Sequence, residues 1–198
     1  LKPALIAKGI SPAFESSVET ICAGRQVRGE IEYIFAVNFT PEEGYSIPKH
    51  GYGVPAPVSA TITLPNDGRP VYEIAEYAKV DFKKSGEKQS ASISFAPGQM
   101  LAFARTSRPV GGILVGAPSV SCDLTRENES PIRIELTAAL VDNNRQLLAG
   151  TAPLQITVTD PVGVARYYLY RAAEGGVCSI SLPLAANDAA GKWTVAVK

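Results

Sequence analysis

The side chains best suited to binding or chemistry gather in residues 41–57. This segment holds Tyr45, Lys49, His50 and Tyr52 between several glycines and prolines. Exposed tyrosine rings can stack on the apolar faces of sugars, while polar side chains bind the hydroxyl groups. Long loops often carry function, so the segment is a candidate ligand-binding loop. Its isoleucine and prolines favour a second interpretation, in which the loop packs against a neighbouring domain of a larger protein.

Catalytic constellations are not apparent in the sequence. His50 is the only histidine and no Gly-x-Ser-x-Gly elbow occurs, so the sequence does not suggest a nucleophile with its base. Glycoside cleavage needs two carboxylates that face one bond. The first domain offers several acids, among them Glu73. Glu30 and Glu32 would lie together on the polar face of one strand, which is normal for a solvated face. We therefore predict no catalytic residues.

Cofactor and metal sites are also not expected. Gly111-Gly112 lacks the Lys and Ser/Thr that follow in a phosphate-binding loop, and no calcium loop rich in aspartate occurs. Cys22, Cys122 and Cys178 are far apart without a CxxC pair. The favoured interpretation is three small buried apolar residues, and a bridge between Cys122 and Cys178 is the alternative.

Composition limits the partners. The chain has 198 residues, with 19 basic and 19 acidic side chains and no net charge. From this charge balance we expect neither nucleic acid nor an anionic membrane surface as a partner. No apolar run approaches the roughly 20 residues of a membrane helix, so no membrane insertion is expected. Because the chain starts at Leu1 and its one methionine is Met100, we interpret both ends as cut sites in a larger protein.

Alternating apolar and polar residues dominate the pattern and predict strands. The apolar residues Ile31, Tyr33, Phe35 and Val37 would share one face of a strand. Similar alternation occurs in residues 58–64, 90–95, 132–141, 154–159 and 193–197. Turn residues separate these runs, so an all-β fold is predicted. Residues 71–80 fit either a short helix or a pair of strands.

Three tyrosines form a second aromatic cluster, at Tyr167, Tyr168 and Tyr170. Strand alternation places Tyr168 and Tyr170 opposite Tyr167 and Leu169. One side must then expose tyrosine or bury it against another domain. An interface is one interpretation, and ordinary packing within the sheet is the favoured one.

The chain is expected to form two tandem antiparallel β-sandwich domains of immunoglobulin-like type. The run of glycine and proline before residue 119 places the junction near residues 116–119. The first domain would span residues 1–116 and the second residues 117–198, both of ordinary domain size. The second has room for the seven short strands of an immunoglobulin-like sandwich.

Short motifs in the first domain carry a family resemblance. They are residues 37–40 (VNFT), 60–65 (ATITLP), 70–73 (PVYE), 95–99 (FAPGQ) and 101–104 (LAFA). This series resembles the accessory β-sandwich that follows the catalytic barrel in many bacterial glycoside hydrolases. Glu73 stands where the motif commonly has Asp.

A second resemblance covers residues 154–161 (LQITVTDP) and 181–195 (SLPLAANDAAGKWTV). These segments look like the macroglobulin-like, immunoglobulin-type domains of large secreted proteins. Locally, Asp160 to Gly163 reads as a hairpin turn, and Asp188 and Gly191 as a side-chain cap and a glycine with positive φ. These residues specify a fold and need no chemistry.

Together the resemblances imply a non-catalytic structural or interaction module of an exported bacterial protein. Its location would be secreted, periplasmic or cell-envelope, and its partners the neighbouring domains of the parent chain. The alternative is a carbohydrate-binding module that uses the loop of residues 41–57. A macroglobulin-type adhesion or protease-trapping protein is a third interpretation.

Overall fold

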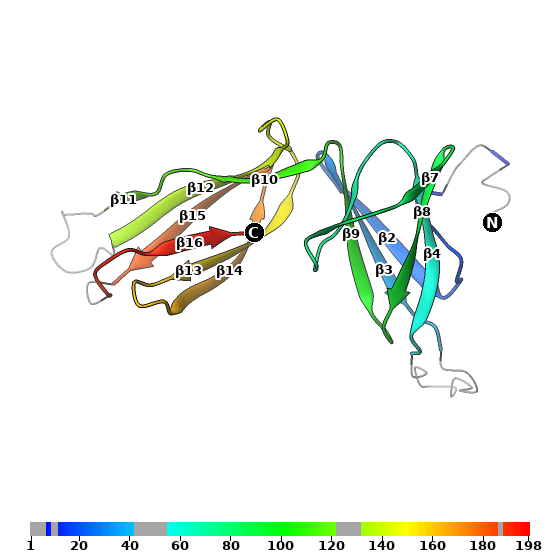
Figure 1. The fold of residues 1–198 in the computed structure, drawn as a ribbon, viewed down its shortest axis with the longest axis horizontal. Helices are drawn as coiled ribbons and strands as arrows, with labels where there is room; N and C mark the ends of the chain where they lie inside the picture. Colours follow the sequence, from blue (N-terminus) through cyan, green and yellow to red (C-terminus); the bar gives the residue numbers. More distant parts are fainter. Residues whose placement is uncertain (1–6, 9–11, 42–54, 122–131, 186–187) are drawn as a thin grey trace. The chain divides into compact units, whose positions relative to one another are not determined.

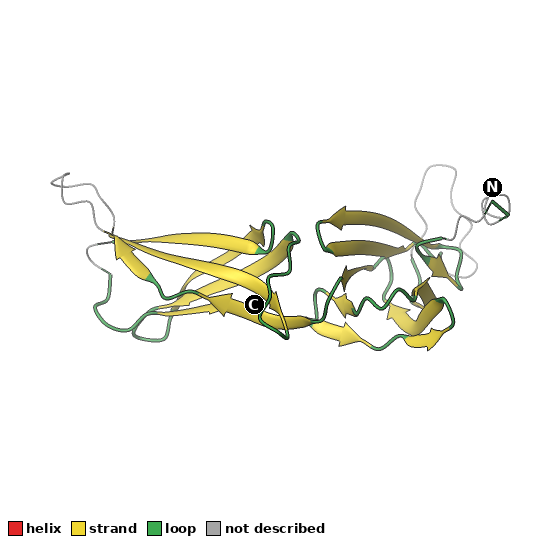
Figure 2. Cartoon of the chain, turned by 90° about the horizontal axis from the view of Figure 1, so that it is seen from above, coloured by secondary structure: helices red, strands yellow, loops and turns green. Residues whose placement is uncertain are grey.

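The structure is a computed structural model that describes residues 7–8, 12–41, 55–121, 132–185 and 188–198. The chain divides into two compact units. Unit 1 comprises Leu1–Val27 and Glu32–Ser107, and unit 2 comprises Arg28–Ile31 and Arg108–Lys198. All described elements are strands in antiparallel sheets, with no helix in these ranges (Figure 2). The predicted all-β fold is confirmed.

The described residues of unit 1 form two sheets, and Figure 1 labels most of their strands. One has the order β1-β4-β8-β7 and the other the order β2-β3-β9-β5-β6. Apolar residues of both sheets form one core between them, which makes this unit a sandwich. The strands are β1 (Glu15–Ser16), β2 (Ile21–Arg28), β3 (Ile31–Asn38), β4 (Val58–Pro65), β5 (Val71–Glu73), β6 (Ala78–Val80), β7 (Lys83–Ser85), β8 (Lys88–Phe95) and β9 (Met100–Thr106).

Strand β3 corrects the prediction for its polar face. Ile34 and Ala36 belong to the core, and Glu32 is only 1% exposed on the same side of the strand. The opposite face is also largely covered, because Tyr33 is buried and stacks on Phe35 with ring centroids 6.2 Å apart. Burial raises the pKa of Tyr33 to about 12. The solvated face predicted for Glu32 was wrong, since β3 is covered on both sides.

Residues 71–80 form a strand pair, which settles the choice between helix and strands. Strands β5 and β6 pair antiparallel, and the turn between them puts Tyr77 at a φ of 52°. The β-branched and aromatic residues of this segment therefore act as strand formers.

The described residues of unit 2 form seven strands in two sheets. In one sheet β12 pairs with β10, β11 and β15; the other has the order β14-β13-β16. Apolar residues of both sheets again form one core. The strands are β10 (Val110–Val115), β11 (Ser119–Ser121), β12 (Ile132–Asp142), β13 (Ala152–Thr159), β14 (Ala165–Ala173), β15 (Val177–Leu184) and β16 (Thr194–Val197).

The predicted junction at residues 116/117 lies between β10 and β11. Both of these strands pair with β12, so the compact unit that contains them begins at Arg108. The sandwich architecture of each unit follows from its sheets and core. The immunoglobulin-like arrangement of the strands stays a prediction.

The short segment Arg28–Ile31 belongs to unit 2 as well. Gly29 forms a bridge with Gly150, and Glu30 donates its backbone N–H to the carbonyl of Ala149 at 3.0 Å. Gly29 has a φ of 62°, and a Cβ there would lie 2.0 Å from the Ala149 oxygen. Only glycine fits this approach of two backbones.

The cysteines differ from the favoured interpretation in one case. Cys22 is exposed on β2, so it is not the buried apolar residue that was predicted. Cys178 is a free thiol buried in the unit 2 core, and this burial raises its pKa. Cys122 lies outside the described residues.

In the described part of the chain, no helix is long and apolar enough to cross a membrane.

Candidate functional site

The predicted ligand-binding loop falls almost wholly outside the described residues. Tyr45, Lys49, His50 and Tyr52 lie in the undescribed range 42–54, so their role stays a prediction.

A buried ion-pair cluster lies in unit 1. Glu32 of β3 accepts a hydrogen bond from Arg105 of β9, with Nη1 2.7 Å from Oε2. Both side chains are only 2% exposed. Arg25 of β2 bonds the other carboxylate oxygen of Glu32, and Arg69 approaches to 3.6 Å. The carboxylate is thus surrounded by guanidinium groups and almost wholly shielded from solvent.

The same cluster joins the two sheets of unit 1. Arg105 Nη2 donates to the carbonyl of Pro65 at the end of β4, at 3.0 Å, and to Asp67 at 2.5 Å. Gln89 of β8 donates to the same Pro65 carbonyl at 3.0 Å. These contacts hold strand ends together, which is a structural role.

Glu73 is the second buried acid of unit 1. Its Oε2 accepts the backbone N–H of Glu76 at 2.6 Å, which closes the turn after β5. Its Oε1 has no hydrogen-bond partner among the described residues.

Two buried aspartates of unit 2 organise turns. Asp142 Oδ1 accepts the backbone N–H groups of Gln146 at 2.8 Å and Asn144 at 2.9 Å, while Arg108 binds Oδ2 at 2.6 Å. The bond from the Gln146 backbone contributes most to lowering the pKa of Asp142, burial opposes it, and Asn144 and Arg108 lower it further. This carboxylate stabilises the end of β12.

Asp160 acts similarly, as the sequence predicted for this turn. Its Oδ1 accepts the N–H groups of Val162 at 3.0 Å and Val164 at 2.8 Å, and Arg166 binds Oδ2 at 2.7 Å. Burial alone would raise the pKa of Asp160, but the bonds from Val164, Arg166 and Val162 lower it overall.

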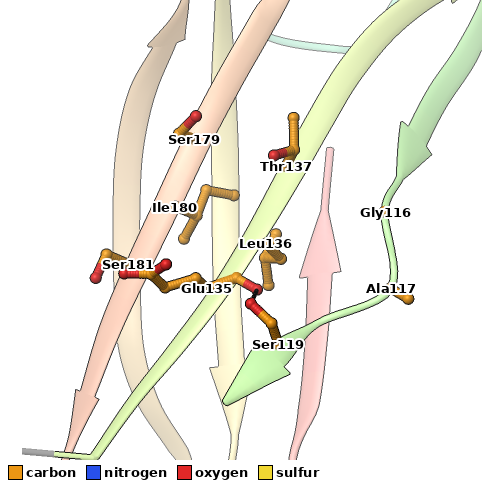
Figure 3. Close-up of a pocket in the computed structure, with 9 residues that line it drawn as sticks. All are labelled: Gly116, Ala117, Ser119, Glu135, Leu136, Thr137, Ser179, Ile180 and Ser181. Atoms are coloured by element: carbon orange, nitrogen blue, oxygen red, sulfur yellow. Dashed lines mark hydrogen bonds between the residues drawn. The ribbon is translucent and has the colours of Figure 1, made fainter. Parts of the chain in front are cut away.

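A pocket of about 370 Å³ opens where the edge of one unit 2 sheet is irregular (Figure 3). Residues 116–118, between β10 and β11, lie opposite only Leu136 and Thr137 of β12, which makes a β-bulge. Hydroxyl groups and one carboxylate, Glu135, line the pocket together with small and apolar residues: Gly116, Ala117, Ser119, Leu136, Thr137, Ser179, Ile180 and Ser181. A single exposed carboxylate beside serines provides no activated nucleophile.

The strongest candidate for binding is the outer side of the β14-β13-β16 sheet. Tyr168 and Tyr170 are 57% and 63% exposed there, on the side opposite Tyr167 and Leu169, which pack against the core. The alternation predicted for the three tyrosines is confirmed. The two exposed rings meet edge to face, with centroids 5.6 Å apart and an interplanar angle of 76°.

Strand register shows what surrounds these rings. Tyr170 lies opposite Gln155, and Tyr168 lies opposite Thr157, which in turn lies opposite Ala196 of β16. Gln155 donates its side-chain amide to the Tyr168 hydroxyl. We call this surface the tyrosine face; it comprises Gln155, Thr157, Thr159, Tyr168, Tyr170, Thr194 and Ala196.

Metal binding gains no support from the described ranges, where no group of three His, Cys, Asp or Glu side chains is arranged to hold an ion. Neither a protein-family model nor a curated protein matches the chain.

Sequence reasoning identified the tyrosine cluster but favoured ordinary packing for it. It missed the buried role of Glu32, because Arg105 lies 73 residues away along the chain. A charged residue inside an otherwise apolar run, such as Arg105 after Leu-Ala-Phe-Ala, is a signal that could have suggested a buried partner.

Proposed function

We propose that the chain is a non-catalytic structural or interaction module of a larger exported protein. This proposal rests on the hydrogen bonds that the buried acidic side chains accept. Glu32, Asp142 and Asp160 accept bonds from arginines or turn N–H groups within their own unit. Acids that hold strands and turns are not available to transfer protons to a substrate.

The association with a glycoside hydrolase-like parent, and the immunoglobulin-like class of unit 2, rest on motif resemblance. The turn geometry supports the second motif at residue level. Asp160 caps its turn, and Asp188 Oδ2 accepts the N–H of Ala185 at 2.7 Å. In such a parent, deleting this region would alter stability or assembly and leave the chemistry of the active site nearly unchanged.

Carbohydrate binding is the second candidate function. It was first proposed for the loop of residues 41–57, and the exposed tyrosines of unit 2 now give it a described surface.

A turnover assay tests the non-catalytic proposal. The 198-residue chain is incubated with chromogenic glycosides and polysaccharides of varied linkage, and product is followed over time. We expect no turnover above that of a boiled sample. Turnover that disappears in Glu32→Gln or Glu73→Gln, with the variants still folded by circular dichroism, would contradict the proposal.

A further inference from the structure

We infer that the tyrosine face of unit 2 binds a neutral saccharide chain. This inference rests on the proposed function as an interaction module and specifies the ligand and the surface. It is independent of the loop of residues 41–57.

The rings provide the apolar part of the site. Tyr168 and Tyr170 are the two large aromatic side chains of this sheet that are more than half exposed. Their edge-to-face contact presents the face of one ring and the edge of the other. The electron-rich face of an aromatic ring attracts the positively polarised C–H groups on the apolar side of a sugar.

The neighbouring strands provide a floor beside the rings. Residues on β13 and β16 are smaller than tyrosine: Thr157 and Ala196 continue the row of Tyr168, and Thr159 and Thr194 pair in the next row. Adjacent strands lie about 4.8 Å apart, so the floor extends roughly 10 Å from the tyrosines across two strand spacings. A sugar ring placed against Tyr168 would reach the hydroxyl groups of this floor.

Polar groups on the face suit hydroxyl ligands. Gln155 is half-buried and donates its amide to the Tyr168 hydroxyl, which holds both groups in place. Thr157, Thr159 and Thr194 add hydroxyl groups that donate and accept. Binding sites for small ligands combine apolar contact with a few fixed polar groups in this way.

Charge decides between classes of ligand. None of the seven residues that define the tyrosine face is charged. Lys198 lies on the same side of the sheet, directly opposite Gln155 in the row of Tyr170, and the half-exposed Arg166 is paired with Asp160 at 2.7 Å. One lysine gives little electrostatic attraction to a polyanionic partner and repels a cationic one, whereas a neutral saccharide needs no such attraction.

Calorimetry on the full chain tests the inference. Cello-, xylo-, manno- and malto-oligosaccharides are the probes, and we expect saturable binding to at least one of them. Tyr168→Ala with Tyr170→Ala should weaken that binding roughly tenfold or more, because both stacking surfaces are lost. Tyr168→Phe with Tyr170→Phe should keep most of it, because the rings remain.

Tyr77→Asn is the matched control. Tyr77 is 58% exposed, in unit 1, and its φ of 52° is a conformation that asparagine tolerates. This variant should bind like the unaltered chain. Thermal melts should show that the Tyr168 and Tyr170 variants remain folded.

The outcomes separate the inference from the proposed function. Saccharide binding that is unchanged in the double alanine variant, or absent throughout the panel, overturns the inference and leaves an interaction role intact. Binding confined to acidic polysaccharides and lost in salt also overturns it. Self-association that the double variant abolishes in sedimentation would identify a protein interface instead. Hydrolysis of a probe by the chain would contradict the proposed function itself.

Discussion

At the scale of single residues, the stability of unit 1 depends on the buried ion pair of Arg105 and Glu32. Removing two charges from water costs several kcal/mol per ion, and mutual attraction offsets this only when the remaining donors and acceptors are also satisfied. Arg105 reaches Glu32, Asp67 and the Pro65 carbonyl. Losing Arg105 would therefore remove the buried donor that Glu32 Oε2, Asp67 and the Pro65 carbonyl share.

Replacing Arg105 tests this dependence. Arg105→Met should destabilise unit 1 by about 3–5 kcal/mol, because buried acceptors on Glu32 and Pro65 lose their charged donor. Arg25→Ala is the control: Arg25 binds the same Glu32, but its side chain is 54% exposed, so screening by water should make its loss cost less than the loss of Arg105. Urea unfolding of both variants measures the difference.

A second substitution identifies the cause. Glu32→Leu combined with Arg105→Met removes both charges and should recover much of the lost stability. Equal destabilisation by Arg105→Met and Arg25→Ala would show that the buried pair has no special role.

At the scale of elements, sequence alternation predicted strands where one face is exposed. Strands β4, β12 and β13 show buried residues at alternate positions, and β8 alternates partly buried with exposed residues toward its end. The core side of β3 was misread, because its polar residues Glu32 and Asn38 are buried by distant partners. Asn38 bonds the carbonyls of Ala56 at 2.7 Å and Ala96 at 3.0 Å. Partners this far along the chain leave no local pattern.

Two further limits of prediction from the sequence have physical reasons. Strand β2 was not predicted, because after Ile21 its residues are all exposed and carry no apolar alternation. The tyrosine cluster was placed correctly, since alternation fixes which side chains share a face. Alternation does not predict whether the face that holds Tyr168 and Tyr170 is covered or exposed, because that depends on what packs against the sheet.

We predict that Asp160, in the turn after β13, makes the stability of unit 2 depend on pH. Hydrogen bonds hold the pKa of Asp160 below its ordinary value of 3.8 in the folded chain. A group with a lowered folded pKa contributes stability above its unfolded pKa, and this contribution is lost as pH falls through the folded value. Unit 2 should therefore lose stability as pH falls below about 4.

Asp160→Asn should be less stable than the unaltered chain at neutral pH and should depend less on pH in the acid range. Glu135→Gln, which removes one negative charge from an exposed sheet position, is the control. Thermal melts at a series of pH values compare the three proteins. Parallel pH curves for Asp160→Asn and the unaltered chain would show that the carboxylate does not link unit 2 stability to pH.

At the scale of the whole molecule, each unit has its own core. The core cluster of unit 1 and that of unit 2 share no residue, and each unit has the size of an independent domain. The two units are not simply consecutive along the chain, because Arg28–Ile31 belongs to unit 2 but lies within the sequence of unit 1. A single cut before Arg108 would therefore separate Arg28–Ile31 from the rest of unit 2.

A fragment of residues 108–198 tests this requirement. In the complete chain, Ile31 is 2% exposed and packs at Gly150, and Glu30 Oε2 accepts the N–H of Ala149 at 2.7 Å and binds Arg108 at 3.1 Å. Losing a buried isoleucine and these bonds should cost about 2–4 kcal/mol. For a unit of this size, the melting temperature should fall by roughly 10–20 °C.

The substitution Glu30→Ala in the complete chain isolates the polar part of this effect. It should lower the unit 2 transition by less than the fragment does, because Ile31 and the backbone bond from Glu30 to Ala149 remain. Calorimetry of the complete chain, the variant and the fragment gives the order of stability. A fragment as stable as unit 2 in the complete chain would mean that Arg28–Ile31 contributes nothing to it, and that unit 2 is complete from Arg108 onward.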